Sequence, residues 1–258
     1  MISDPGILRS TVLWLLLALP AVAGDEAIIR AGREVYQAEG CIHCHSQYVR
    51  PGSADASRWG PPHSLAELAA ESPPLFGNRR QGPDLQNIGA RRSPAWQRLH
   101  LKAPRALTPG SRMPSYAYLF RADGTGDGEA LVAYLGSLGE TTRQEWWNGV
   151  EHWRPAPVAP APSSRGRQLF QENCSSCHGS TGRGDGALAL RLTRAPRDLT
   201  RAEWLFLSRT RGNEAERLAL ARIIKFGVMG SEMAGREYLT DDDVVALAAY
   251  VQALRVAR

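Results

Sequence analysis

The chain has 258 residues, a length that suits two modest domains, and its 22% charged and 7% aromatic residues are ordinary for a globular protein. Its formal net charge of +5 comes almost wholly from arginine, because Lys102 and Lys225 are the only lysines. No basic run is interleaved with aromatic residues, and this composition argues against a nucleic-acid-binding protein.

Residues 1–23 are predicted to be a secretory signal peptide. Arg9 precedes an apolar run that ends by Ala23, and small residues lie before the expected cleavage site near Gly24. The uninterrupted apolar stretch is only about thirteen residues long, whereas a membrane span needs about twenty. An uncleaved anchor is the alternative, but we expect cleavage and export to the periplasm.

All four cysteines lie in two C-x-x-C-H motifs. These are Cys41 and Cys44 followed by His45, and Cys174 and Cys177 followed by His178. Two intervening residues place both thiols on one side of a helical turn, where they can add to the two vinyl groups of one haem, with the histidine as the proximal iron ligand. A lone C-x-x-C could be a disulfide, a redox pair or half a zinc site, but no cysteine remains to complete a zinc tetrad. The sequence therefore predicts two covalently bound haem c groups.

Three methionines follow the motifs and are candidates for the sixth iron ligand. Met113 stands beside Pro114 in a predicted loop, which favours ligation of the first haem over the usual gap-filling role of methionine. The second haem has two candidates, Met229 and Met233, and only one of them can bind.

The chain repeats one helical plan. Gly32 and Tyr36 precede the first motif much as Gly166 and Phe170 precede the second, and each half ends in an apolar helix that carries a tyrosine. Thr240 is the predicted N-cap of the last helix. The fold is therefore predicted to be all-α, with two tandem domains at residues 24–149 and 165–258.

A proline-rich linker is predicted between the domains, at residues 150–164. Its four prolines in near alternation favour an extended, semi-rigid spacer. Trp146, Trp147 and Trp153 lie just before and within it. We expect them to close the edge of the first domain, and a docking patch for a partner is the alternative.

The second domain, from Gly166 to the end, resembles class I cytochrome c domains. In that family the methionine ligand commonly precedes a tyrosine of the terminal helix by the interval that separates Met233 from Tyr250. The resemblance favours Met233. Ala234 stands where the family usually has proline, and Met229 remains the alternative.

The first domain carries a longer series of motifs. These are the first C-x-x-C-H motif, Gly82-Pro83-Asp84-Leu85, Gly89-Ala90-Arg91, Trp96, His100-Leu101, Pro104-Arg105 and Met113-Pro114-Ser115-Tyr116. Over about residues 28–120 this series resembles the mono-haem subunit of cbb3-type cytochrome c oxidases. The resemblance implies thioether bonds at Cys41 and Cys44, axial ligation by His45 and Met113, and contact of Arg50 with a haem propionate. A solvated loop charge is the alternative for Arg50. It implies that His63 and His100 are not ligands.

The expected function is outer-sphere electron transfer by a periplasmic di-haem cytochrome c, not catalysis. The expected partner is a membrane-bound haem-copper oxidase or a nitric-oxide-reductase-like complex. A cytochrome subunit of another periplasmic dehydrogenase is the main alternative. A di-haem peroxidase is a weaker one, because it needs an iron that can become five-coordinate and both halves supply a methionine.

Overall fold

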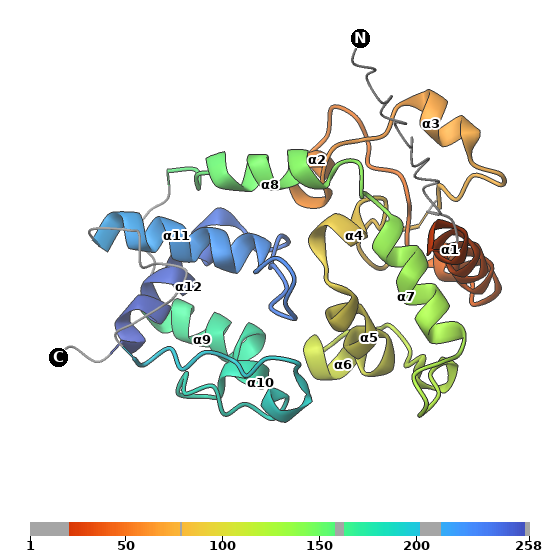
Figure 1. Cartoon of the computed structure of the whole chain (residues 1–258). Helices are drawn as coiled ribbons and strands as arrows, with labels where there is room; N and C mark the ends of the chain where they lie inside the picture. The colour runs from red at the N-terminus through yellow and green to blue at the C-terminus, as the bar shows by residue number, and fades with distance from the viewer. Residues whose placement is uncertain (1–20, 78, 158–162, 202–212, 256–258) are drawn as a thin grey trace, which may run out of the picture.

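The computed structural model describes residues 21–77, 79–157, 163–201 and 213–255, so most of the expected signal peptide lies outside the described residues. Within these ranges the regular elements are helices, and an isolated β-bridge pairs Gly227 with Ala234. Two groups of helices lie side by side, with α8 stretched across them (Figure 1). We call α1 to α7 the first unit and α9 to α12 the second unit. The all-α prediction is confirmed.

The first unit is built on two long helices, α1 (Ala21–Ala38) and α7 (Asp127–Ser137), which cross in close contact. Short helices connect them: η1 (Cys41–His43), α2 (Asp55–Trp59), α3 (Leu65–Ala70), α4 (Ile88–Arg91), α5 (Pro94–Lys102), α6 (Pro104–Leu107) and η2 (Ala117–Leu119). At the crossing, a Cβ added to Gly32 would lie 1.9 Å from the carbonyl oxygen of Ala130. Tyr36, one turn later, is fully buried with its ring 5.5 Å from that of Tyr134.

The second unit repeats this crossing. Its helices are α9 (Ser163–Asn173), α10 (Ser175–His178), η3 (Ala189–Arg191), α11 (Asn213–Phe226) and α12 (Asp241–Leu254). A Cβ on Gly166 in α9 would lie 2.4 Å from the carbonyl oxygen of Ala246 in α12, and the rings of Phe170 and Tyr250 are 5.4 Å apart. The Thr240 hydroxyl accepts from a backbone N–H of the first turn of α12, as the sequence predicts for its N-cap.

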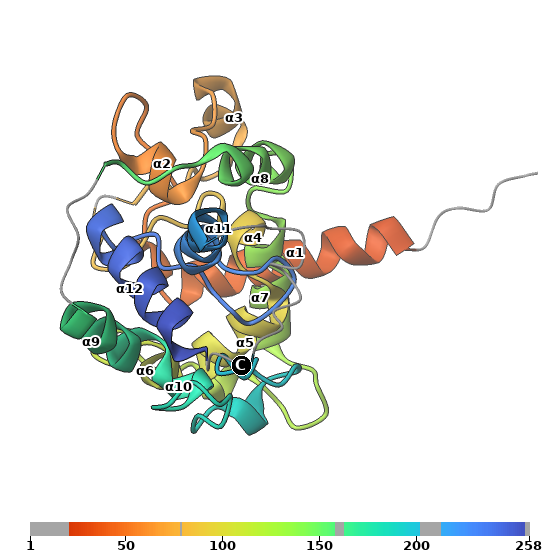
Figure 2. The same ribbon diagram turned by 90° about the vertical axis from the view of Figure 1, so that its left-hand side faces the viewer.

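Helix α8 (Arg143–His152) joins the two units through tryptophan side chains. The rings of Trp146 and Trp153 lie 5.5 Å and 5.4 Å from that of Phe226, the last residue of α11, both edge-on. Figure 2 shows α8 above α11 from a second direction. These tryptophans therefore pack against the second unit and do not merely close the edge of the first. The expected spacer, 150–164, begins within α8 and ends within α9, and its residues 158–162 lie outside the described residues.

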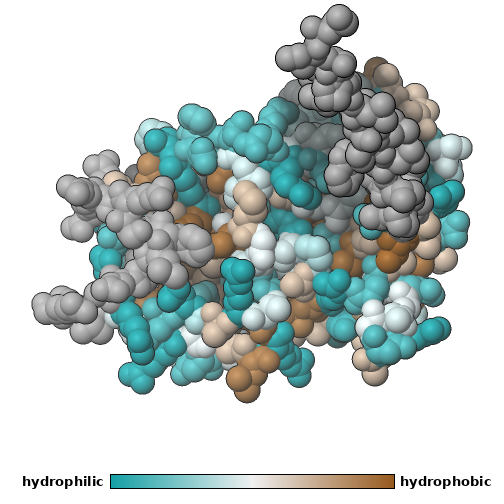
Figure 3. Space-filling view, in the orientation of Figure 1, coloured by the Kyte–Doolittle hydropathy of each residue, from teal (hydrophilic) through white to brown (hydrophobic). Residues whose placement is uncertain are grey.

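The molecular face seen in Figure 3 is mostly hydrophilic, with apolar side chains in small separate patches. Among the described helices, none combines the length and the apolar character that a membrane span requires.

Candidate haem-binding cavity

A cavity of about 1050 Å³ lies between the two units and draws its walls from both. Every predicted thioether and axial position lines it. These residues are Cys41, Cys44, His45 and Met113 of the first unit, and Cys174, Cys177, His178 and Met233 of the second. The sequence predicts two attachment sites but gives no indication that they open into the same space.

Each C-x-x-C-H motif forms a single helical turn. The backbone N–H of His45 donates to the carbonyl of Cys41 (2.9 Å), and that of His178 donates to the carbonyl of Cys174 (2.9 Å). The turn brings each pair of thiols close to its histidine, as attachment of one porphyrin edge requires. Burial raises the pKa of Cys41 and of Cys174 to about 11, so both thiols are protonated at neutral pH before attachment.

The two histidines are oriented in the same way. Nδ1 of His45 lies 2.8 Å from the carbonyl oxygen of Pro83, and Nδ1 of His178 lies 3.0 Å from that of Arg197. A carbonyl only accepts, so Nδ1 carries the proton and the lone pair of Nε2 is left for a metal. Burial lowers the pKa of both imidazoles, which keeps them neutral and able to ligate.

A glycine gives the first histidine room. A Cβ on Gly82 would lie 2.3 Å from Cε1 of His45, while the Gly82 N–H donates to the carbonyl of Cys44 (3.0 Å). Any larger residue here would push the imidazole out of place. The Gly82-Pro83 pair thus has a physical role, since its first residue leaves space for the ring and its second orients it.

Met113 and Met233 share a local geometry. The backbone N–H of each donates to the hydroxyl of a serine two residues earlier, Ser111 at 3.2 Å and Ser231 at 3.1 Å. Met113 is partly buried against the core of the first unit, and Met233 is 37% exposed on the cavity wall. Met229 is 60% exposed and is not among the lining residues.

Arginines supply positive charge around the cavity, but not at the expected position. Arg50 is exposed and lies outside the lining, whereas Arg58 and Arg80 are part of it. Arg80 is held by hydrogen bonds to the hydroxyl of Ser46 (2.7 Å) and the carboxylate of Asp55 (2.6 Å). Of Arg50 and Arg80, only Arg80 borders the cavity.

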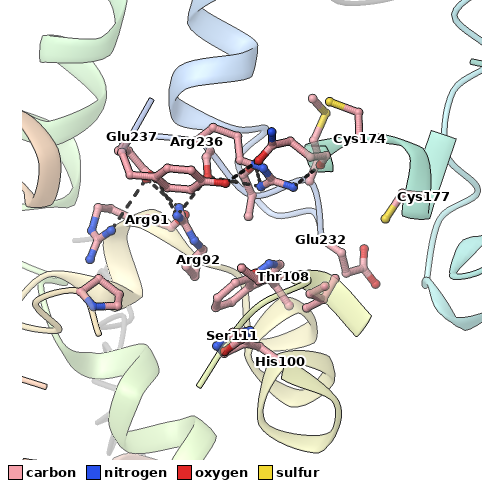
Figure 4. Close-up of a pocket in the computed structure, with 18 of the residues that line it drawn as sticks. Arg91, Arg92, His100, Thr108, Ser111, Cys174, Cys177, Glu232, Arg236 and Glu237 are labelled. Atoms are coloured by element: carbon pink, nitrogen blue, oxygen red, sulfur yellow. Dashed lines mark hydrogen bonds and ion pairs between the residues drawn. The ribbon is translucent and has the colours of Figure 1, made fainter. Parts of the chain in front are cut away.

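His100 also lines the cavity, and its surroundings bear on whether a haem fits there. Its ring stacks on Trp96 with centroids 4.5 Å apart, and its buried Nδ1 has no hydrogen-bond partner among the described residues. Burial lowers its pKa to about 4, so the ring is neutral. Figure 4 shows His100 and Ser111 below the Arg92 side chain on the cavity wall.

The rest of the lining suits a large, mainly apolar ring with carboxylate groups at one edge. Its apolar members include Ile88, Leu107, Phe170, Leu220, Ile224 and Val251. An apolar wall interrupted by arginines and by an unsatisfied imidazole nitrogen matches a porphyrin with propionates, and the residues present fit haem.

Two family models match the chain. Residues 21–129 match the model described as cytochrome C oxidase, mono-heme subunit/FixO, and residues 163–255 match the model described as cytochrome c. Among solved structures, a chain of the reducing HAO-like protein complex of Kuenenia stuttgartiensis is 17% identical, with 88% of this chain and 96% of that chain covered and a TM-score of 0.32. The matched domains indicate haem c binding. The N-terminal half of the chain resembles the mono-haem subunit of cbb3-type cytochrome c oxidases, and its C-terminal half resembles cytochrome c.

Proposed function

We propose that the chain is an exported di-haem cytochrome c that carries electrons between redox proteins by outer-sphere transfer. One observation carries the proposal: both C-x-x-C-H motifs and one methionine from each unit line a single cavity. Bound haem supplies a reversible one-electron change at its iron. The chain's own residues hold that group and orient its ligands.

The proposed axial ligands are His45 with Met113 and His178 with Met233. Two protein ligands at each iron leave no position for a substrate, which supports a carrier over a peroxidase. Thioether sulfur and an apolar wall both favour the reduced iron, so we expect two high reduction potentials.

The proposed partner is a membrane-bound haem-copper oxidase or a nitric-oxide-reductase-like complex. The match of residues 21–129 to an oxidase subunit model supports this class. A periplasmic location follows from the predicted signal peptide and from haem c attachment outside the bacterial cytoplasm. Another periplasmic dehydrogenase is the alternative partner.

Mixing experiments with the purified holoprotein test this function. The reduced protein is expected to be reoxidised rapidly by a detergent-solubilised cbb3-type oxidase under oxygen, and only slowly by hydrogen peroxide alone. Rapid turnover of peroxide would contradict the electron-carrier assignment. Reduction by a periplasmic dehydrogenase, without any oxidation by the oxidase, would select the alternative partner.

The ligand of the second haem can be tested with a matched pair of variants. Met233→Ala is expected to remove about half of the far-red methionine-to-iron absorption band, because one of two equivalent thioether ligands is lost. Met229→Ala should leave the band unchanged, since Met229 is exposed outside the cavity. The absorption spectrum of each oxidised holoprotein gives the answer. The reverse pattern would move the assignment to Met229.

A further inference from the structure

The loop that carries Met233 is bonded to the opposite unit on both sides of the methionine. Before it, the carbonyl of Ser231 accepts from the hydroxyl of Ser93 (2.8 Å). After it, the carbonyl of Gly235 accepts from Nη2 of Arg92 (3.2 Å). Ser93 is also the N-cap of α5, so the anchor is part of a defined helix start.

An ion pair strengthens the second anchor. Arg92 meets the two carboxylate oxygens of Glu237 with Nη1 at 2.8 Å and Nη2 at 2.7 Å. The two side chains are only 8% and 4% exposed. Arg91 faces the same carboxylate at 3.7 Å. Figure 4 shows Glu237 beside Arg91 and Arg92, on the opposite side of the cavity from Cys174 and Cys177.

The buried ion pair between Arg92 and Glu237 fixes how the two units meet at this point. A two-pronged guanidinium–carboxylate contact fixes both the distance and the orientation of its partners, and removal of one partner leaves an unpaired buried charge. Burial acts to raise the pKa of Glu237, but the charges of Arg92 and Arg91 outweigh it and lower that pKa, so the carboxylate stays ionised.

The second unit also holds this loop. The Val228 N–H donates to the Met233 carbonyl (2.9 Å), and the Thr193 N–H donates to the carboxylate of Glu232 (2.7 Å). The carbonyls of Ser231 and Gly235, however, accept from side chains of the first unit. The backbone on both sides of Met233 is therefore held by the two units together, and the position of the sulfur depends on both.

We propose that Arg92 and Ser93 of the first unit are positioning residues for the Met233 ligand of the second haem. This proposal rests on the proposed function, specifically on ligation by Met233. It makes the iron ligation of one half of the chain depend on the other half, so the second unit alone is incomplete as an electron carrier.

The test compares Arg92→Ala and Glu237→Gln with the wild-type holoprotein. Each variant is expected to lose about half of the far-red methionine-to-iron band, and Arg92→Ala combined with Met233→Ala should lose no more than Met233→Ala alone. Covalent haem content should stay at the wild-type level, because neither residue contacts the thiols. Arg92→Lys should recover only part of the band, since an ammonium group lacks the two-pronged geometry.

Arg98→Ala is the matched control. Arg98 lies in helix α5, six residues after Arg92, and also forms an ion pair, with Glu129 at 2.6 Å, but that pair is inside the first unit. Its band should equal that of the wild type. A full band in Glu237→Gln, which preserves side-chain size, would overturn the proposal even if Arg92→Ala failed to fold. A wild-type band that is insensitive to Met233→Ala would instead refute the ligand assignment.

Discussion

Replacement of Cys174 and Cys177 together by serine is expected to remove the second haem and to unfold most of the second unit. Without the two thiols the porphyrin has no covalent attachment in this half. The cavity wall here is also the core. Leu220, Ile224 and Val251 are each about 5–6% exposed and belong both to the main apolar cluster of the unit and to the cavity lining. The ring would pack against this same cluster, and its loss would remove those contacts.

The second unit is expected to unfold without its haem because the unit is small. A domain of this length has little apolar surface of its own to bury, so a large ring held between its helices contributes much of the core. Folding and binding are then coupled, as they are for small metal-dependent domains. Haem staining and a pyridine haemochrome assay should give about half of the wild-type haem per chain, and far-ultraviolet circular dichroism should show loss of helix.

The converse variant is the control. Cys41→Ser with Cys44→Ser should remove the first haem instead, and the two double variants should therefore lose different haem signals. Because Trp146 and Trp153 pack on Phe226, loss of either unit is expected to weaken the other without unfolding it completely. Retention of both haems in either variant, or an unchanged helix content, would contradict this account.

Local spacing explains what the sequence predicts well. The C-x-x-C-H turns and the N-cap at Thr240 each depend on residues only a few positions apart, so their geometry follows from the backbone of one turn. The repeated helix crossing is also readable, because the same glycine-aromatic pattern occurs in both halves and both form the same contact in the structure.

Contacts between distant loops explain what the sequence does not predict. The carbonyl groups that orient His45 and His178 belong to Pro83 and Arg197, which are 38 and 19 residues further along the chain. A backbone carbonyl has no residue signature. The Gly82-Pro83-Asp84-Leu85 motif does not reveal that the Pro83 carbonyl meets His45, and no motif named in the sequence contains Arg197.

The contact between the units is equally hidden in the sequence. Glu237 pairs with Arg92 across 145 residues, and one glutamate among many charged residues does not reveal its partner. The same limit accounts for Arg50. The resemblance to the oxidase subunit implies a propionate contact for Arg50, but its side chain is exposed and outside the cavity lining, whereas Arg80 lines the cavity.

Gly32→Ala is expected to destabilise the first unit strongly, although alanine is the better helix former. In an isolated helix the change would stabilise by about 1 kcal/mol. Here the new Cβ would lie 1.9 Å from the carbonyl oxygen of Ala130 and 2.7 Å from Cβ of Tyr134. Two helix backbones must move apart to admit it, and Tyr36 would lose its packing on Tyr134 as they do. Overpacking of this kind costs about 1–3 kcal/mol and occasionally more, so after the gain in helix propensity we expect a net loss of up to about 2 kcal/mol.

Thermal unfolding of the holoprotein measures the loss of stability. Substitutions at two further glycines separate the effect of the close helix crossing from that of helix propensity. Gly166→Ala should destabilise the second unit in the same way, because its Cβ would lie 2.4 Å from the Ala246 carbonyl oxygen in the equivalent crossing. Gly149→Ala is the control. It lies in α8 with no atom within 4 Å of the added Cβ, so helix propensity alone should act and stabilise by up to about 1 kcal/mol. If all three variants were stabilised, backbone propensity and not the close helix crossing would govern these positions.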